Sequence, residues 1–335
     1  MSARLRGAGL VMVWSSGFVG ADLGARHAPP DTVLTWRCLG TAVVLLPWAI
    51  QAVARLDRRE WVRQAVLALL CQCLYLGGVF WAASAGVPAG TSALVASLQP
   101  ALVLTAAVVL TGRGWRRSYL AGLALGTTGV ALTAAGDLRA GVAVVALVLP
   151  LVAMLSLTAG TLLQQHWCTQ NGPMPSLVQT LAVQSAVTAV VFTAYTTAVG
   201  HLTPPRTTGF WVTVAWAVVA GVGSYGLYYF VTARDGAARA STLLYLTPGV
   251  TALWAAPMFG QPIRITTLAG LVISASAVVL LRSASLRDTR PNTANGLNNI
   301  PAVPPAQALR EPLAAGDGST QPHVGCNIQP TNPSR

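Results

Sequence analysis

The chain has 335 residues, of which 53% are hydrophobic and only 9% are charged, and its formal net charge is +12. Because soluble domains carry about 25% charged residues, this composition excludes an ordinary water-soluble protein. The positive charge would indicate nucleic acid in a soluble chain, but here it comes from arginine alone, mostly in short connectors, without a basic and aromatic nucleic-acid module. Membrane topology explains the charge better than a nucleic-acid partner does.

Apolar segments of near-spanning length recur from Leu5 to Arg282, and a bilayer needs about 20 mostly apolar residues per helix. Arginine clusters, polar breaks and corners rich in proline and glycine separate these segments. The sequence therefore predicts an all-α, polytopic membrane protein of about ten transmembrane helices. The predicted spans are 7–25, 32–54, 64–83, 91–111, 119–136, 142–163, 177–199, 210–232, 240–259 and 266–282.

The first span, within VMVWSSGFVGADLGARHAPP (residues 11–30), contains the carboxylate of Asp22. An ionised carboxylate at depth costs at least a few kcal/mol and usually has a partner. Ser15 and Asp22 share a helical face opposite a glycine-rich packing face, and Arg37 of the second span is the expected partner, with Arg26 and His27 as rivals. Two interpretations stay open: Asp22 links the first helical hairpin at the membrane rim, or it faces a cavity and takes part in coupling.

Polar and aromatic residues that share one helical face are further candidates for substrate binding. Besides Ser15, Asp22 and Arg37, they are Gln72 and Tyr75 on the third span, Tyr225, Tyr228 and Tyr229 on the eighth, and Ser241 and Tyr245 on the ninth. Two structural alternatives stay open for these residues. The tyrosines of the eighth span would also suit an interfacial aromatic belt, and the amides and hydroxyls could instead bond neighbouring helices.

The sequence contains an internal repeat. SLQPALVL at 97–104 aligns with YLTPGVTA at 245–252, which places Pro100 opposite Pro248, and YLAGL at 119–123 aligns with TLAGL at 267–271. Halves of five helices each have an odd number of crossings, so the second half is inverted relative to the first. We predict two inverted repeats, residues 1–136 and 137–282, with Pro100 and Pro248 as hinges or as fixed kinks.

The arginines also predict the orientation. With the N-terminus inside, most arginines fall in cytoplasmic segments, and the opposite side has only Arg26, Arg139, Arg206 and Arg264. The positive-inside rule then predicts a multi-pass protein of the plasma (inner) membrane with both termini in the cytoplasm. Residues 283–335 are rich in proline, asparagine and glycine without periodicity, which predicts a disordered cytoplasmic tail.

Three segments resemble the EamA family of the drug/metabolite transporter superfamily. VWSSGFVGADLGARHAPPDTVLTWRCLGTAVVLL resembles the family's opening, with an aromatic-serine start, a proline turn and an arginine early in the second helix. GTSALVASLQPALVLTAAVVLTGRGWRRSYLAGLALGTTGVAL and ARASTLLYLTPGVTALWAAPMFGQPIRITTLAGLVISASAVVLL are similar to its paired later segments. The resemblance covers roughly residues 7–282. It implies a ten-helix transporter of small organic metabolites, often an exporter of amino acids or related compounds, with a cavity between the halves.

We therefore expect a secondary transporter, working as an exporter by alternating access, with a passive channel or a lipid-handling membrane protein as the alternative. An enzyme is not expected, because His27, His166 and His201 fall in connectors and no H-E-x-x-H motif is present. The five cysteines lack metal-site spacing, so we expect no catalytic residue, metal or cofactor. The expected partners are a small-molecule substrate and the lipid bilayer, with a homodimer as one possible assembly.

Overall fold

The computed structural model describes residues 2–53, 56–110, 117–170, 176–235, 240 and 243–288. These residues form helices and no strand, which confirms the predicted all-α class for the described part of the chain. Residues 289–335 of the predicted tail, and Ser241, lie outside the described residues. The helices are α1 (Ala3–Ala25), α2 (Pro30–Val44), α3 (Leu46–Val53), α4 (Arg58–Ala68), the π-helical turn η1 (Leu69–Leu74), α5 (Tyr75–Ser84), α6 (Ala89–Ala96), α7 (Gln99–Leu110), α8 (Arg117–Arg139), α9 (Val144–Gln170), α10 (Leu177–Ala198), α11 (Thr208–Asp235), α13 (Thr247–Phe259) and α14 (Ile265–Asp288).

Several of these helices are long and apolar enough to cross a membrane. In the described residues there are five such helices, or six if α2 and α3, which meet at an angle of 71°, form one bent span. Shorter apolar helices cover 89–103 and 265–277. The predicted span 32–54 is therefore not one straight helix: α2 ends near Leu45, and its 15 residues extend only about 22 Å, less than the roughly 30 Å of a bilayer core.

Local sequence signals set the helix starts. The side chains of Ser2, Asp57 and Ser176 accept hydrogen bonds from backbone N–H groups in the first turns of α1, α4 and α10, which satisfies donors that a helix start leaves free. At α10 the cap is a full capping box with Gln179. Pro29 and Pro30 precede and open α2, where a missing N–H costs nothing.

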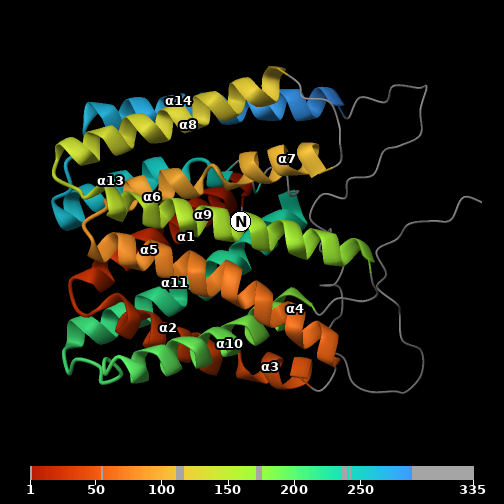
Figure 1. Cartoon of the computed structure of the whole chain (residues 1–335), viewed down its shortest axis with the longest axis vertical. Helices are drawn as coiled ribbons and strands as arrows, with labels where there is room; N and C mark the ends of the chain where they lie inside the picture. The colour runs from red at the N-terminus through yellow and green to blue at the C-terminus, as the bar shows by residue number, and fades with distance from the viewer. Residues whose placement is uncertain are drawn as a thin grey trace, which may run out of the picture.

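The helices lie side by side, and the chain runs back and forth between two ends of the molecule (Figure 1). Connectors 26–29, 85–88, 140–143, 199–207 and 260–264 meet at one end, which we call the corner end. Gly86, Gly141, Gly200 and Gly260 all have positive φ there, the left-handed conformation that ends helices with little strain in glycine. The end of α14 lies at the other end, which we call the terminal end, and α1 starts on that side of the molecule, where Arg6 contacts Asp235 at the end of α11.

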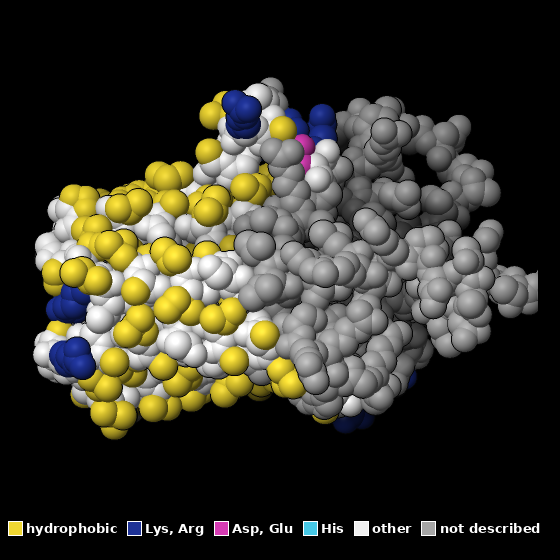
Figure 2. Space-filling model, turned by 90° about the horizontal axis from the view of Figure 1, so that it is seen from above, with side chains coloured by type: hydrophobic (Ala, Val, Ile, Leu, Met, Phe, Trp, Pro, Cys, Tyr) yellow, Lys and Arg dark blue, Asp and Glu magenta, His cyan; other side chains and the backbone are white. Residues whose placement is uncertain are grey.

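The surface between the two ends is apolar. Over the face formed by α8 and α14, hydrophobic side chains cover the middle and arginines lie only toward the ends (Figure 2). Large apolar side chains are widely exposed, with Val145 at 77% and Ile265 at 84%. A soluble monomer rarely exposes so much contiguous apolar surface, whereas lipid tails would cover it.

Small residues allow the closest helix contacts. A Cβ atom at Gly129 of α8 would lie 2.6 Å from the Gly270 carbonyl oxygen of α14, and a Cβ at Gly270 would lie 2.5 Å from the Gly129 oxygen. The other main pairs are α1 with α11, α2 with α10, α5 with α9, and α6 with α13. Close approach at small residues is the usual packing mode of membrane helices.

Candidate functional site

A cavity lies between helices that are far apart in the sequence. Its lining comes from α2, η1 and α5 on one side and from α10 and α11 on the other; the lining residues are Arg37, Cys38, Thr41, Cys71, Gln72, Leu76, Leu181, Ser185, Gly221 and Tyr225. We call it the Arg37 cavity. Among these described residues none is acidic, so arginine provides the fixed charge of the site.

Arg37 projects from the middle of α2 toward α11. Its Nε atom donates to the Ala217 carbonyl oxygen at 3.3 Å, and its Nη2 atom lies where Gly221 leaves room, since a Cβ at Gly221 would be only 2.9 Å away. The expected ion pair between Asp22 and Arg37 is not formed. Instead, the described carboxylates contact other groups: Asp22 contacts Gln261, Asp31 contacts His201, Glu60 contacts Arg63 and Gln64, Asp137 contacts Thr91 and Arg264, and Asp235 contacts Arg6.

Two further polar groups in the cavity lining are buried without a protein partner. The side-chain nitrogen of Gln72 (residue exposure 7%) and the hydroxyl of Ser185 (2%) have no hydrogen-bond partner among the described residues. Gln72 lies in the π-helical turn η1, and such turns often occur at functional sites. A buried donor without a partner costs free energy, so these two groups, beside Arg37, mark a place where a polar ligand would be favourable.

The cavity is narrow in this conformation. Its volume is about 30 Å³, and since one water needs at least about 10–15 Å³ of such space, it has room for roughly two waters. An organic metabolite would require its walls to separate.

Asp22 lies at the corner end, away from the Arg37 cavity. Its carboxylate accepts a hydrogen bond from the Gln261 side chain, in the connector between α13 and α14. The neighbouring Arg26 stacks over the Phe259 ring at 4.7 Å and donates to the Phe259 carbonyl oxygen at 3.1 Å. Asp22 and Arg26 therefore connect α1 to the end of α13 and the connector after it, rather than to α2.

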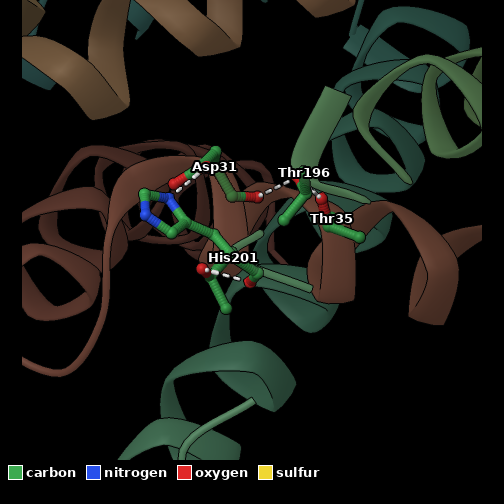
Figure 3. Close-up of polar contacts among 5 residues, drawn as sticks. Asp31, Thr35, Thr196 and His201 are labelled. Atoms are coloured by element: carbon green, nitrogen blue, oxygen red, sulfur yellow. Dashed lines mark hydrogen bonds and ion pairs between the residues drawn. The ribbon is translucent and has the colours of Figure 1, made fainter. Parts of the chain in front are cut away.

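A second polar cluster at the corner end joins α2 to the connector after α10 (Figure 3). The His201 ring nitrogen Nδ1 lies 2.9 Å from Asp31 Oδ2, and the Thr32 hydroxyl donates to the His201 carbonyl oxygen at 2.9 Å. Thr35, about one turn after Asp31 in α2, shares a hydrogen bond of 2.7 Å with Thr196. This cluster holds the start of α2, and so helps to position Arg37 two turns further along that helix.

The remaining sequence candidates fall in different places. Tyr225 lines the cavity and, like Tyr228, packs edge-on or tilted against Trp14 at 5.9 and 5.8 Å. Tyr75 packs against the hydrophobic core and is not among the lining residues. The Ser15 hydroxyl donates to the Thr247 carbonyl oxygen at 3.3 Å, and Tyr245 is half-buried in the turn before α13. The Tyr229 side chain and Ser241 lie outside the described part of the chain.

The two aligned prolines occupy matching places. Pro100 is the second residue of α7 and Pro248 is the second residue of α13, each just after a two-residue turn. At this position a proline lacks only an N–H that the helix would not use. Both prolines therefore mark breaks between helical segments rather than kinks within one helix.

Sequence comparison identifies the family. The sequence model of the EamA-like transporter family matches residues 3–135 and 144–283. The chain belongs to this family. The predicted EamA membership is thus confirmed, and this EamA-like transporter is a multi-pass membrane protein and a transporter rather than an enzyme.

The chain is also similar to two individual proteins. The EamA-like chain is 27% identical, over 273 residues, to a Salmonella typhimurium (strain LT2) protein described as "Probable amino-acid metabolite efflux pump", a match that covers 79% of this chain and 89% of that protein. It also resembles a solved crystal structure with a TM-score of 0.56 at 17% identity, covering 86% of this chain and 99% of that one. At that identity the likeness shows the fold alone.

Sequence reasoning did not find Ser185, the role of Gly221 or the π-helical turn. Ser185 follows Gln184 inside the apolar span 177–199. Two adjacent polar residues in such a span could have indicated a polar site there. Gly221 lies inside the apolar span 210–232, and it provides space for the Arg37 guanidinium. No local pattern predicts a π turn in the segment LLCQCL.

Proposed function

We propose that this EamA-like transporter is a secondary exporter of small organic metabolites, in the class of amino acids and related compounds, and that it works by alternating access around the Arg37 cavity. The observation that carries the proposal is the cavity's position. It lies between α2, η1 and α5 from the first half of the chain and α10 and α11 from the second. Relative motion of two halves would therefore change access to it.

The helix pairs support two inverted halves of five spans, residues 1–136 and 137–282. If α2–α3, α4–η1–α5 and α6–α7 each count as one span, then α2 and α10 are equivalent elements, as are α8 and α14, and each packs against its counterpart. The pair α1 with α11 has its equivalent in α9 with α5. This is the pairing that a two-fold axis in the membrane plane would produce, and the two family matches, 3–135 and 144–283, agree with it.

The arginine distribution supports an orientation in the plasma (inner) membrane with both termini in the cytoplasm. The terminal end has Arg4, Arg6, Arg58, Arg59 and Arg234 among its described residues. By the positive-inside rule this end faces the cytoplasm. The substrate would leave at the corner end.

Counterflow in proteoliposomes tests the proposed function. Vesicles containing the full chain are loaded with an unlabelled amino acid or related metabolite, and entry of the labelled compound is followed with and without a pH gradient. A carrier gives transient accumulation that depends on the internal compound. Flux without counterflow would indicate a channel, and absence of flux for every solute, with lipid flipping instead, would indicate a lipid-handling protein.

A further inference from the structure

The Arg37 cavity has the chemistry of an anion site. The Arg37 guanidinium, the Gln72 amide and the Ser185 hydroxyl all line it, from α2, η1 and α10 respectively. We propose that these three groups form a carboxylate subsite, so that the transported metabolites are small organic acids recognised through their carboxylate. This inference rests on the proposed function, and it adds the chemical group by which the cavity selects its substrate.

The first argument is charge. A charged side chain within a membrane protein is costly and generally pairs or marks a substrate path. Arg37 donates to a neutral backbone oxygen, at Ala217, and no described carboxylate contacts it. A carboxylate ligand would supply the missing negative charge, and a guanidinium binds carboxylates with two parallel hydrogen bonds.

The second argument is the two buried donors without a partner. The Gln72 nitrogen and the Ser185 hydroxyl hydrogen are available to an acceptor within the cavity. A carboxylate has two oxygens that together accept about four hydrogen bonds. The carboxylate can therefore accept hydrogen bonds from Arg37, Gln72 and Ser185 together. A neutral amide has only one oxygen and is a poorer acceptor for three donors.

The third argument concerns the other end of the ligand. No described lining residue is acidic, and Leu76, Leu181 and Tyr225 provide apolar and aromatic surface. A compound with a positive charge and no carboxylate would meet Arg37 without a compensating group. The site should thus favour an acid over its own amide, whatever the rest of the molecule.

The experiment compares acids with their amides on the purified full chain. Thermal stabilisation is measured as a function of concentration for L-leucine against L-leucinamide and for N-acetyl-L-leucine against its amide, because a ligand stabilises the protein according to its Kd. We expect the acids to bind about tenfold more tightly or better, since hydrogen bonds to charged groups have that strength. The difference should vanish in Arg37→Gln and persist in the control Arg139→Gln, an exposed arginine at the end of α8.

Further variants separate binding from folding. Gly221→Ala keeps the arginine but places a Cβ 2.9 Å from its Nη2 atom, so it should weaken acid binding while the unfolding midpoint stays unchanged. Gln72→Leu and Ser185→Ala remove buried donors without partners. The unfolding midpoint should therefore stay unchanged or rise, whereas acid binding should weaken. If they lowered the midpoint and left acid binding unchanged, the groups would be structural and the subsite would be disproved.

The two proposals fail in different ways. Equal binding of acids and amides, or no response to any of the four compounds, would overturn the carboxylate subsite whatever the transport assay shows. Acid binding that depends on Arg37 without counterflow of the same acids would overturn the proposed transport function and leave the subsite in place.

Discussion

At the scale of single residues, the polar side chains of the membrane-embedded part fall into two groups. Several have partners that lie in the other half of the chain: Asp22 contacts Gln261, Arg26 contacts Phe259, and Arg6 contacts Asp235. In the Arg37 cavity, the Gln72 amide nitrogen and the Ser185 hydroxyl lack a partner among the described residues. Groups of the first kind connect the two halves of the chain, and donors of the second kind are the ones that the proposed ligand would bind.

The Asp22–Gln261 contact gives a stability prediction. Asp22 is buried, with 6% exposure, and Gln261→Leu would remove its side-chain donor, so unfolding should become easier by about 1–3 kcal/mol. The double variant Asp22→Leu/Gln261→Leu should recover part of this loss, because it removes both partners. Unfolding midpoints of the purified protein measure both effects, with Gln51→Leu on the exposed face of α3 as control. Additive effects of the two changes would contradict a direct interaction.

At the scale of elements, close packing at glycine fixes the helix pairs, and α8 with α14 is the clearest case. Each of Gly129 and Gly270 faces the backbone oxygen of the other, so neither position has room for a side chain. The contact therefore requires a glycine in each of the two helices. By contrast, Gly226 of α11 is exposed, and a Cβ there would meet nothing within 4 Å.

These glycines predict opposite outcomes for the same substitution. Gly129→Ala forces α8 and α14 apart and should destabilise the protein by about 1–3 kcal/mol. Gly226→Ala should be neutral or slightly stabilising, because alanine is the better helix former. Membrane yield and the unfolding midpoint distinguish them, and equal midpoints for the two variants would show that the α8–α14 contact can relax.

At the scale of the whole molecule, polar contacts join the elements at both ends. Arg6 and Asp235 form a bidentate ion pair at the terminal end, with N–O distances of 3.0 and 2.6 Å. Asp22, Arg26, Asp31 and His201 connect elements at the corner end. Under the proposed alternating access one end opens at a time, so each set of contacts is expected to break in one half of the cycle.

Breaking the terminal-end ion pair should open the cavity toward that end. Cys71 lines the cavity, so its reaction with a membrane-impermeant maleimide, in a variant with the other four cysteines replaced by serine, reports access. We expect Arg6→Gln to raise the labelling rate from that side about tenfold, which corresponds to about 1.4 kcal/mol. Arg6→Asp with Asp235→Arg should restore the slow rate. An unchanged rate in Arg6→Gln would show that the pair does not gate the cavity.

Periodicity and composition predicted much of the fold because a bilayer imposes a length and an apolar character on each crossing. They located the corners and the arginine-rich end, and they selected Arg37, Gln72 and Tyr225, which line the cavity. They did not predict that Asp22 contacts Gln261, 239 residues away, because a local pattern contains no information about which helices of the two halves meet. The bend after α2 and the π turn also depend on tertiary packing rather than on local preference.

The close approach of Arg37 to Gly221 has a consequence for how this protein can evolve. The guanidinium occupies the volume that a side chain at position 221 would need. A substitution at either position therefore depends on the residue at the other. Among descendants of this sequence, a larger residue at 221 should appear only together with a shorter one at 37. A genetic screen for suppressors of Gly221→Ala should accordingly recover changes at or around Arg37, and those suppressors should alter which acids the purified protein binds.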